Sequence, residues 1–222
     1  MCIRALPWIW LCFLVWRHPV AAEPGQAEPG AAELGQNVPQ QPPGRFSAGV
    51  FLGGGLLSDE IELGNAFFAD QVPGSGFLFG LRGAYIILPD LTVEGQVRVR
   101  LSVEVEGNLL LSSTGRAEMR PSRFAPVFAW RVHSVLDVAW QGALTPFALV
   151  GIGGQTVISD SLYMWSPDTD AAIHFGVGSR YHLAGRYGLR ADLRLGITAG
   201  RYQAVSSIVE AHFGFFYRLA RH

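Results

Sequence analysis

Four histidines are the residues best suited to catalysis or metal binding. Neutral imidazole is a common metal ligand and general base, and His133, His174, His182 and His212 all fall in stretches of extended character. No His-Glu-x-x-His or comparable spacing joins them, so we expect no metal and no cofactor. Ser134 directly follows His133, and neighbouring side chains of a strand point to opposite faces, which excludes a base–nucleophile pair there. We therefore predict that the protein is not an enzyme.

The segment Leu91–Glu106 alternates apolar and polar residues without a break. Its odd-numbered positions are apolar or Gly, and its even-numbered positions are polar and carry charges of both signs. A period of two places the two sets on opposite faces of one strand. A typical strand has about 5–6 residues, whereas a strand that crosses a membrane needs about 9–11. The alternation therefore predicts a transmembrane β-strand.

The same alternation predicts eight strands in the chain after residue 44. They span residues 45–57, 76–88, 91–106, 123–136, 145–159, 171–183, 187–199 and 207–219. Pro89-Asp90 is expected to form a tight turn between the second and third strands. Long connections at 58–75, 107–122 and 160–170 alternate with short ones. Short turns at one end and long loops at the other predict an all-β fold, an eight-stranded antiparallel up-and-down transmembrane β-barrel.

The polar faces of these strands are expected to line the inside of the barrel. An eight-stranded barrel is just wide enough to be filled by side chains, and buried charges must be paired. We therefore interpret this face as a satisfied polar core rather than as a site of chemistry. The predicted lumen network contains Arg82, Glu94, Arg98, Arg100, Glu104, Arg131, His133, His174, Arg180, His182, Arg190, Asp192, Arg194, Glu210 and His212.

The composition excludes several classes of protein. The chain has 222 residues, 17 basic and 18 acidic side chains, and a formal net charge of −1, which argues against a nucleic-acid partner. All of the basic residues are Arg. Hydrophobic residues make up 49% of the chain, but no run of about 18 apolar residues occurs, so no transmembrane helix is predicted.

The N-terminal region predicts export from the cytoplasm. Arg4 precedes a short apolar stretch, and Val20-Ala21-Ala22 offers small residues for cleavage, so residues 1–22 are predicted to be a secretory signal. Cys2 and Cys12 both lie inside it. Residues 23–44 are rich in Pro, Gly and Glu and are expected to form a disordered leader, followed by the barrel at 45–222.

Three segments resemble a known family. They are Pro146-Phe147-Ala148-Leu149-Val150-Gly151-Ile152-Gly153-Gly154, Gly176-Val177-Gly178-Ser179-Arg180-Tyr181 and Tyr187-Gly188-Leu189-Arg190-Ala191-Asp192-Leu193-Arg194. In order and spacing they resemble the OmpA-like eight-stranded outer-membrane barrels, over about 46–219. The resemblance implies a small barrel in the cell outer membrane of a Gram-negative bacterium. Two departures are that no peptidoglycan-binding domain follows, and that the chain does not end on an aromatic residue.

The resulting hypothesis is a small outer-membrane barrel with a plugged polar lumen and a structural or surface-interaction role. Its expected partners are outer-membrane lipid and lipopolysaccharide, the barrel-assembly machinery, and an external ligand bound through the long loops. Three alternatives remain at this point: a narrow pore or porin-like channel, a soluble periplasmic lipocalin-like binding barrel, and a lipid-modifying barrel enzyme. The enzyme is disfavoured because small lipid-A hydrolases of this shape carry a His-x-Ser pair, and this sequence has none.

Overall fold

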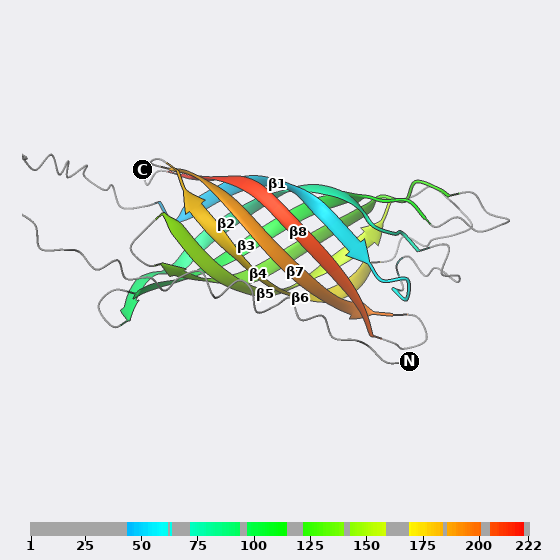
Figure 1. The fold of residues 1–222 in the computed structure, drawn as a ribbon. Helices are drawn as coiled ribbons and strands as arrows, with labels where there is room; N and C mark the ends of the chain where they lie inside the picture. Colours follow the sequence, from blue (N-terminus) through cyan, green and yellow to red (C-terminus); the bar gives the residue numbers. More distant parts are fainter. Residues whose placement is uncertain are drawn as a thin grey trace, which may run out of the picture. The chain divides into compact units, whose positions relative to one another are not determined.

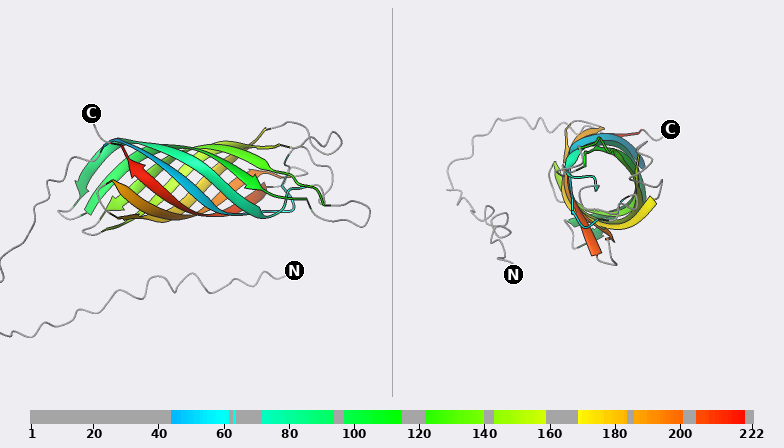
Figure 2. Two further views of the ribbon diagram at one scale, coloured as in Figure 1. Left: turned by 90° about the horizontal axis from the view of Figure 1, so that it is seen from above. Right: turned by 90° about the vertical axis from the view of Figure 1, so that its right-hand side faces the viewer.

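Eight strands form one closed antiparallel barrel, as the sequence predicted. The computed structural model describes residues 44–61, 63, 72–93, 97–114, 122–139, 143–158, 169–183, 186–200 and 205–219. Each strand pairs with its neighbours in sequence, and β1 also pairs with β8, which closes the ring (Figures 1 and 2). The strands are β1 (Phe46–Leu57), β2 (Gly76–Val93), β3 (Val97–Leu111), β4 (Val127–Ala139), β5 (Leu144–Val157), β6 (Thr169–His182), β7 (Tyr187–Ala199) and β8 (Val205–Arg218).

The predicted signal peptide, residues 1–22, lies outside the described residues, as does the leader up to Pro43. In the part of the chain that the structure describes, no helix is long and apolar enough to cross a membrane.

The position of the turn between β2 and β3 corrects one prediction. Pro89-Asp90 does not form the turn: β2 continues to Val93, and the chain reverses direction before Val97. Beside the turn Leu91 pairs with Val99 and Val93 with Val97, so the residues paired there have numbers of the same parity. Directly paired residues of an antiparallel ladder lie on one face of the sheet, and the alternation therefore passes through the turn without a change of phase. For this reason a hairpin looked like one long strand in the sequence.

The two ends of the barrel differ in their connections. The short links β2–β3, β4–β5 and β6–β7 lie at one end, together with the start of β1 and the end of β8. The four longer links lie at the other end. We call these the short-turn end and the long-loop end.

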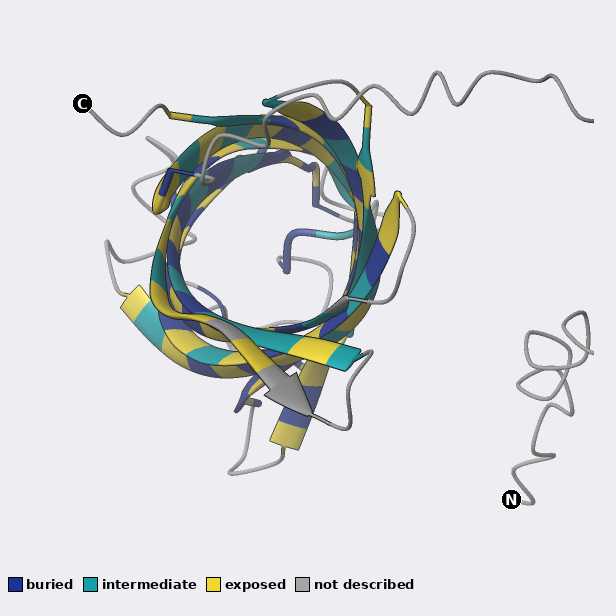
Figure 3. Ribbon diagram, turned by 90° about the vertical axis from the view of Figure 1, so that its left-hand side faces the viewer, coloured by how far each residue is buried: buried dark blue, intermediate teal, exposed yellow. Residues whose placement is uncertain are grey.

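An apolar layer closes the interior at the long-loop end. A segment between β1 and β2 enters the ring of strands there, as the views along the barrel show (Figures 2 and 3). Ile61 and Leu63 of this segment have no exposed surface, and Val72 is also buried. We call this layer the apolar cap; it consists of Ile61, Leu63 and Val72 together with Phe51, Leu78, Leu110, Ala125, Val127, Val157 and Ile208.

A glycine permits close approach at the seam that closes the barrel. Gly53 of β1 pairs with His212 of β8, and a Cβ added to Gly53 would lie 1.9 Å from the carbonyl oxygen of Ala211. A backbone oxygen cannot move aside as the end of a flexible side chain can. Any side chain at position 53 therefore forces β1 and β8 apart.

We predict that Gly53→Ala lowers the free energy of unfolding by about 1–3 kcal/mol, the usual cost of overpacking. Gly83→Ala on β2 is the matched control, because a Cβ there meets nothing within 4 Å. Urea unfolding of the barrel in detergent micelles measures both variants. Equal unfolding midpoints for the two variants would contradict the tight seam.

Candidate functional site

A layer of charged side chains fills the barrel between the apolar cap and the short-turn end. It comes from inward positions of β2, β3, β4, β6, β7 and β8, and its members are buried except Arg180, which is partly buried. We call it the charge cluster; it consists of Arg82, Glu104, Glu106, Arg131, His133, Asp137, His174, Arg180, Arg190, Asp192, Arg194, Glu210 and His212. Its five arginines and five acids balance, so the cluster is neutral when the histidines are neutral.

Arg194 of β7 lies at the centre of the cluster. Its Nη1 and Nη2 donate to the two carboxylate oxygens of Glu106 at 2.8 and 2.9 Å. Its Nε donates to Asp192 Oδ1 at 2.6 Å, and the side chain has no exposed surface. A bidentate guanidinium–carboxylate pair of this kind is among the strongest hydrogen-bonded contacts in proteins. Arg194 thereby connects β7 to β3 across the lumen.

Glu104 and Asp192 each contact several arginines. Glu104 accepts a hydrogen bond from Arg190 and lies 3.7 Å from Arg180 and 3.8 Å from Arg194. Asp192 accepts from Arg190 Nε at 2.8 Å and from Arg82 Nη1 at 3.2 Å, in addition to Arg194. The result is a network rather than a set of separate pairs, because Arg190 and Arg194 each contact both acids.

A second bidentate pair joins β4 to β8. Arg131 donates through Nη1 and Nη2 to the two oxygens of Glu210, the latter bond at 2.6 Å. His212 Nε2 lies 3.2 Å from Glu210, and its ring stacks on Phe51 with ring centroids 4.7 Å apart. Because Phe51 also belongs to the apolar cap, this histidine connects the cap to the cluster.

Most of the predicted lumen residues lie in this cluster. Arg82, Arg131, His133, His174, Arg190, Asp192, Arg194, Glu210, His212 and Glu104 are buried. Arg100, Arg180 and His182 are partly buried nearer the short-turn end. Arg98 is instead exposed, because it lies at the second residue of β3, past the part of the strand that the lumen encloses. Glu94 lies outside the described residues.

Two cluster members are absent from the predicted network. Glu106 forms the bidentate pair with Arg194, and Asp137 accepts a hydrogen bond from Arg180. Asp137 was missed because the fourth strand was predicted to end at Leu136, whereas β4 continues to Ala139. The available signal was the inward alternation Arg131, His133, Val135, Asp137, which the predicted boundary cut short. Glu106 was placed on the polar face of its strand, and the alternation alone was sufficient to include it.

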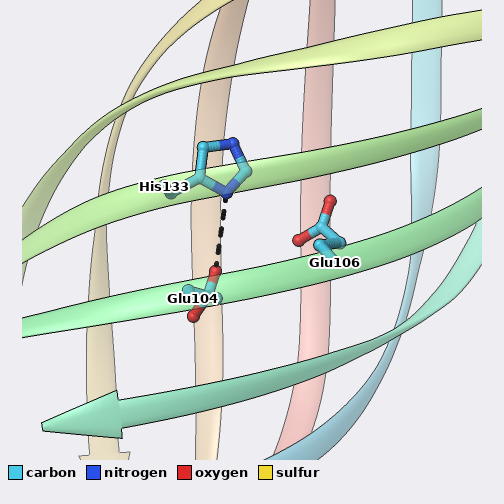
Figure 4. Close-up of side chains that lie close together, drawn as sticks. All are labelled: Glu104, Glu106 and His133. Atoms are coloured by element: carbon cyan, nitrogen blue, oxygen red, sulfur yellow. Dashed lines mark ion pairs between the residues drawn. The ribbon is translucent and has the colours of Figure 1, made fainter.

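Glu104, Glu106 and His133 are close enough to be considered as metal ligands. Each offers one ligand atom, and these atoms lie within 4.8 Å of one another. Figure 4 shows His133 Nδ1 facing Glu104, with 4.0 Å between Nδ1 and Oε1. However, both carboxylates already bond to arginine, and Arg82, Arg131, Arg180, Arg190 and Arg194 all lie within 4.0 Å of one of them. A divalent cation would add charge to a neutral site crowded with guanidinium groups, so the trio does not fit a metal.

His133 and Ser134 lie on opposite faces of β4, since His133 is buried and Ser134 is exposed. A nucleophile and its base must be within hydrogen-bond reach of each other, and this pair is not. The His174 ring packs edge-on against His133 at 5.9 Å, inside the same buried layer. Among the described residues, His133 and Ser134 therefore form no nucleophile–base arrangement.

The fold and interior define a closed eight-stranded barrel with a charged lumen. No protein-family model matches the chain, and neither does any curated protein. Among solved structures the chain is similar to Neisserial surface protein A, with 15% identity and a TM-score of 0.49 over 81% of this chain and 100% of that one. Ail, the attachment invasion locus protein of Yersinia pestis, shows 14% identity and a TM-score of 0.46 over 80% and 99%. The outer membrane enzyme PagL shows 12% identity and a TM-score of 0.44, over 78% of this chain and 99% of that one. At these identities the likeness concerns the fold alone.

We predict that Arg131→Met lowers the free energy of unfolding by about 3–5 kcal/mol, because it leaves the Glu210 carboxylate buried without its main partner. The double variant Arg131→Met with Glu210→Met should cost less than the sum of the two single changes. Arg98→Met is the control, since Arg98 is exposed, and it should change stability by less than about 0.5 kcal/mol. Urea unfolding in micelles measures the stability of Arg131→Met, Glu210→Met, the double variant and Arg98→Met. If the cost of the double variant equals the sum of the two single costs, the pairing is contradicted.

Proposed function

We propose that the protein is an outer-membrane β-barrel of the OmpA-like kind with a plugged lumen, which acts as a structural or surface-interaction protein. The observation that carries this proposal is the inverted distribution of side chains. Charged residues are buried inside the ring, and large apolar residues are exposed outside it. This arrangement is favourable only in an apolar medium. In water the apolar outer side chains would stay exposed to solvent, whereas hydrocarbon removes them from water.

The exposed apolar surface continues around the barrel. Leu81 of β2 is 66% exposed, Val105 of β3 57%, Ile152 of β5 63%, Val177 of β6 62% and Leu193 of β7 59%. Exposed apolar patches larger than a few hundred Å² are rare on soluble monomers and mark contact with a membrane or a partner. A belt on strand after strand fits lipid, which contacts all sides, better than a single protein partner.

Aromatic rings gather on the outer surface near the short-turn end. Phe46 and Tyr85 have ring centroids 4.7 Å apart, and Tyr187 lies 5.0 Å from Tyr217 and 5.6 Å from Phe215. Girdles of aromatic residues flank the apolar band of outer-membrane barrels at the level of the lipid head groups. We therefore place one membrane interface at this end, which in a barrel with short periplasmic turns is the periplasmic side.

The interior favours a plugged barrel over a narrow pore. The charge cluster fills the middle of the lumen with mutual ion pairs, and the apolar cap covers it on the long-loop side. An ion crossing the barrel would have to separate buried pairs and then pass a layer of aliphatic side chains. Both steps carry the large cost of an uncompensated buried charge.

The other two alternatives fit less well. A soluble lipocalin-like barrel holds its ligand in the barrel interior and meets water with its outer face, and here the charged side chains are inside and the apolar ones outside. A lipid-modifying enzyme needs an outward nucleophile and base, and His133 and Ser134 lie on opposite faces. On the same basis we propose outer-membrane lipid and lipopolysaccharide as partners of the belt, insertion by the barrel-assembly machinery, and an external ligand at the long loops.

Localisation tests the proposal directly. We expect the protein to fractionate with outer membranes and to migrate faster on gels when unheated than when boiled, because a closed barrel resists detergent. Recovery of the folded protein in the soluble periplasmic fraction would overturn the membrane proposal.

We predict that Leu193→Arg makes the free energy of folding into a bilayer less favourable by about 2–4 kcal/mol, the cost of an arginine that faces lipid near the midplane. Leu193 lies in the middle of β7 and points outward. Val205→Arg is the depth control, since Val205 is the first residue of β8, and it should cost only about 0–1 kcal/mol. Folding equilibria in lipid vesicles give both values. Equal costs at the two positions would show that depth in a bilayer does not matter and would count against the proposal.

Reconstitution in a planar bilayer tests the plugged lumen. We expect no stable single-channel conductance from the wild-type chain. Glu106→Gln with Arg194→Gln removes the central pair but leaves the apolar cap, so we expect this variant also to stay closed. Large, stable, ion-selective channels in the wild type would refute the plugged lumen and favour the pore.

A further inference from the structure

The hairpin of β2 and β3 extends past the other strands at the short-turn end. β1 begins at Phe46, which pairs with Tyr85 of β2, but β2 continues to Val93 (Figure 1). The eight steps from Tyr85 to Val93 cover at most about 26 Å, because a strand rises about 3.3 Å per residue. We call this part of the chain the projecting hairpin; it consists of residues 87–93 of β2 and 97–101 of β3.

The projecting hairpin lies on the water side of the aromatic rings that we assign to the membrane interface. Phe46 and Tyr85 belong to those rings, and they lie at the base of the hairpin. Each further residue of β2 lies farther from the middle of the barrel. Side chains that meet only water are mostly polar, so a polar surface is expected here.

The outer face of the projecting hairpin is instead apolar. Ile87, Leu88 and Leu91 are 46%, 44% and 53% exposed. Leu88 pairs with Leu101 and Leu91 pairs with Val99, and directly paired residues lie on the same face of a sheet. The exposed apolar side chains of the two strands therefore lie together on one face.

This apolar face is continuous with the outer surface of the barrel. Leu101 also pairs with Leu136 of β4, which is 43% exposed on the outside. The opposite face of the hairpin differs, because Arg98 follows the other phase of the alternation and is exposed. The projecting hairpin is thus amphipathic, and its apolar side extends the proposed lipid-facing belt beyond the aromatic rings.

β2 is irregular where it leaves the barrel. Its pairing with β3 shifts register between Ile86 and Leu88 and again between Leu88 and Leu91, which marks two bulges. A bulge bends its strand and interrupts the ladder, and the exposed Pro89 between them has no N–H to donate. Proteins use bulges and Pro to prevent another strand from pairing with an open edge. These features disfavour a partner that adds a strand, and the bend allows the hairpin to lean away from the barrel axis.

We propose that the apolar face of the projecting hairpin docks on the lipid surface at the short-turn end, with Leu88 and Leu91 among the head groups and Arg98 toward water. This inference rests on the proposed membrane function. Amphipathic helices bind the same interface with their apolar face buried about 5–10 Å, and a hairpin with one apolar face offers lipid the same contact. The barrel holds the base of the hairpin at the interface, so a lean of the hairpin brings the two surfaces together.

Spin labelling measures this contact. Cys2 and Cys12 are the only cysteines of the chain, and with both changed to Ser, Leu91→Cys and Arg98→Cys each carry a single nitroxide. The full chain is folded into nanodiscs of phosphatidylethanolamine and phosphatidylglycerol, whose two faces are both open to solutes. Power saturation then compares access of oxygen, which concentrates in lipid, with access of a nickel complex, which stays in water. We expect the ratio of oxygen to nickel access to be several times higher at position 91 than at position 98.

Each other result at position 91 overturns the proposal. Nickel access equal to that at position 98 places the apolar face in water, and low access of both reagents places it against protein, such as a second copy of the chain. A nitroxide at Leu193→Cys, on the outward face of β7, separates this inference from the membrane proposal. If position 193 is in lipid and position 91 is in water, the docking alone fails; if position 193 is also in water, the membrane proposal fails.

A second variant tests whether the apolar side chains cause the docking. In the Leu91→Cys chain, Ile87→Asp with Leu88→Asp should raise nickel access at position 91 to the value at position 98. Arg98→Gln is the matched control on the opposite face, and it should leave nickel access at position 91 unchanged. A faster gel migration when unheated than when boiled confirms that each labelled chain is folded. If the Ile87 and Leu88 substitutions leave position 91 in lipid, or if Arg98→Gln exposes it equally, the proposal is overturned.

Discussion

The pairing of guanidinium with carboxylate groups inside a closed ring of strands is the interaction on which this structure depends. Closure by β1 and β8 removes the edges of the sheet, so that backbone polar groups along the strands are paired within the ring. The ring is too narrow to hold a wide water-filled channel, and the inward charges must therefore neutralise one another. Five arginines and five acids do so in the charge cluster, and the two bidentate pairs of Arg194 and Arg131 connect opposite walls.

Arginine suits this task better than lysine does. A guanidinium group presents five donors in a plane and can contact several acids at once, as Arg194 contacts Glu106 and Asp192. Its flat faces also stack on aromatic rings: Arg82 lies 4.1 Å from the centre of Phe51, and Arg190 lies 4.3 Å from the centre of Phe147. The exclusive use of Arg among the basic residues of the chain matches an interior where each cation must satisfy several neighbours without water.

The alternation of side chains was sufficient to predict the number of strands and most of the inward residues, although Arg98 is exposed and Asp137 was missed. It worked because a period of two maps directly onto the two faces of a sheet, as in β7, where every second residue is buried. The same property hid the β2–β3 turn, since the parity of Leu91 and Val99 is the same. Strand β5 shows the alternation least clearly, because its inward face is apolar or Gly from Phe147 to Gly153, between the buried polar residues Thr145 and Gln155. The absence of a side chain at Gly153 leaves space for Arg131, because a Cβ added to Gly153 would lie only 2.8 Å from Arg131 Cγ.

Which charges pair was beyond the sequence, because partners lie on strands that are not neighbours. Arg194 on β7 reaches Glu106 on β3, and the contact depends on the stagger of every strand between them. The apolar cap was missed for a different reason. Ile61 and Leu63 lie in a long connection, and residues of loops carry no periodic signal to show that they fold back into the ring.

The apolar cap also bears on the order in which the barrel assembles. Ile61, in the first connection, forms a β-bridge with Gly200, in the last, and the backbone N–H of Ser58 donates to the carbonyl oxygen of Ser207 at 3.1 Å. These contacts join opposite ends of the chain across the seam between β1 and β8. Both contacts need β8 to lie beside β1, so we expect this part of the cap to form together with the closure of the barrel. We expect the arginines and acids of the interior to keep access to water through the open side until the barrel closes.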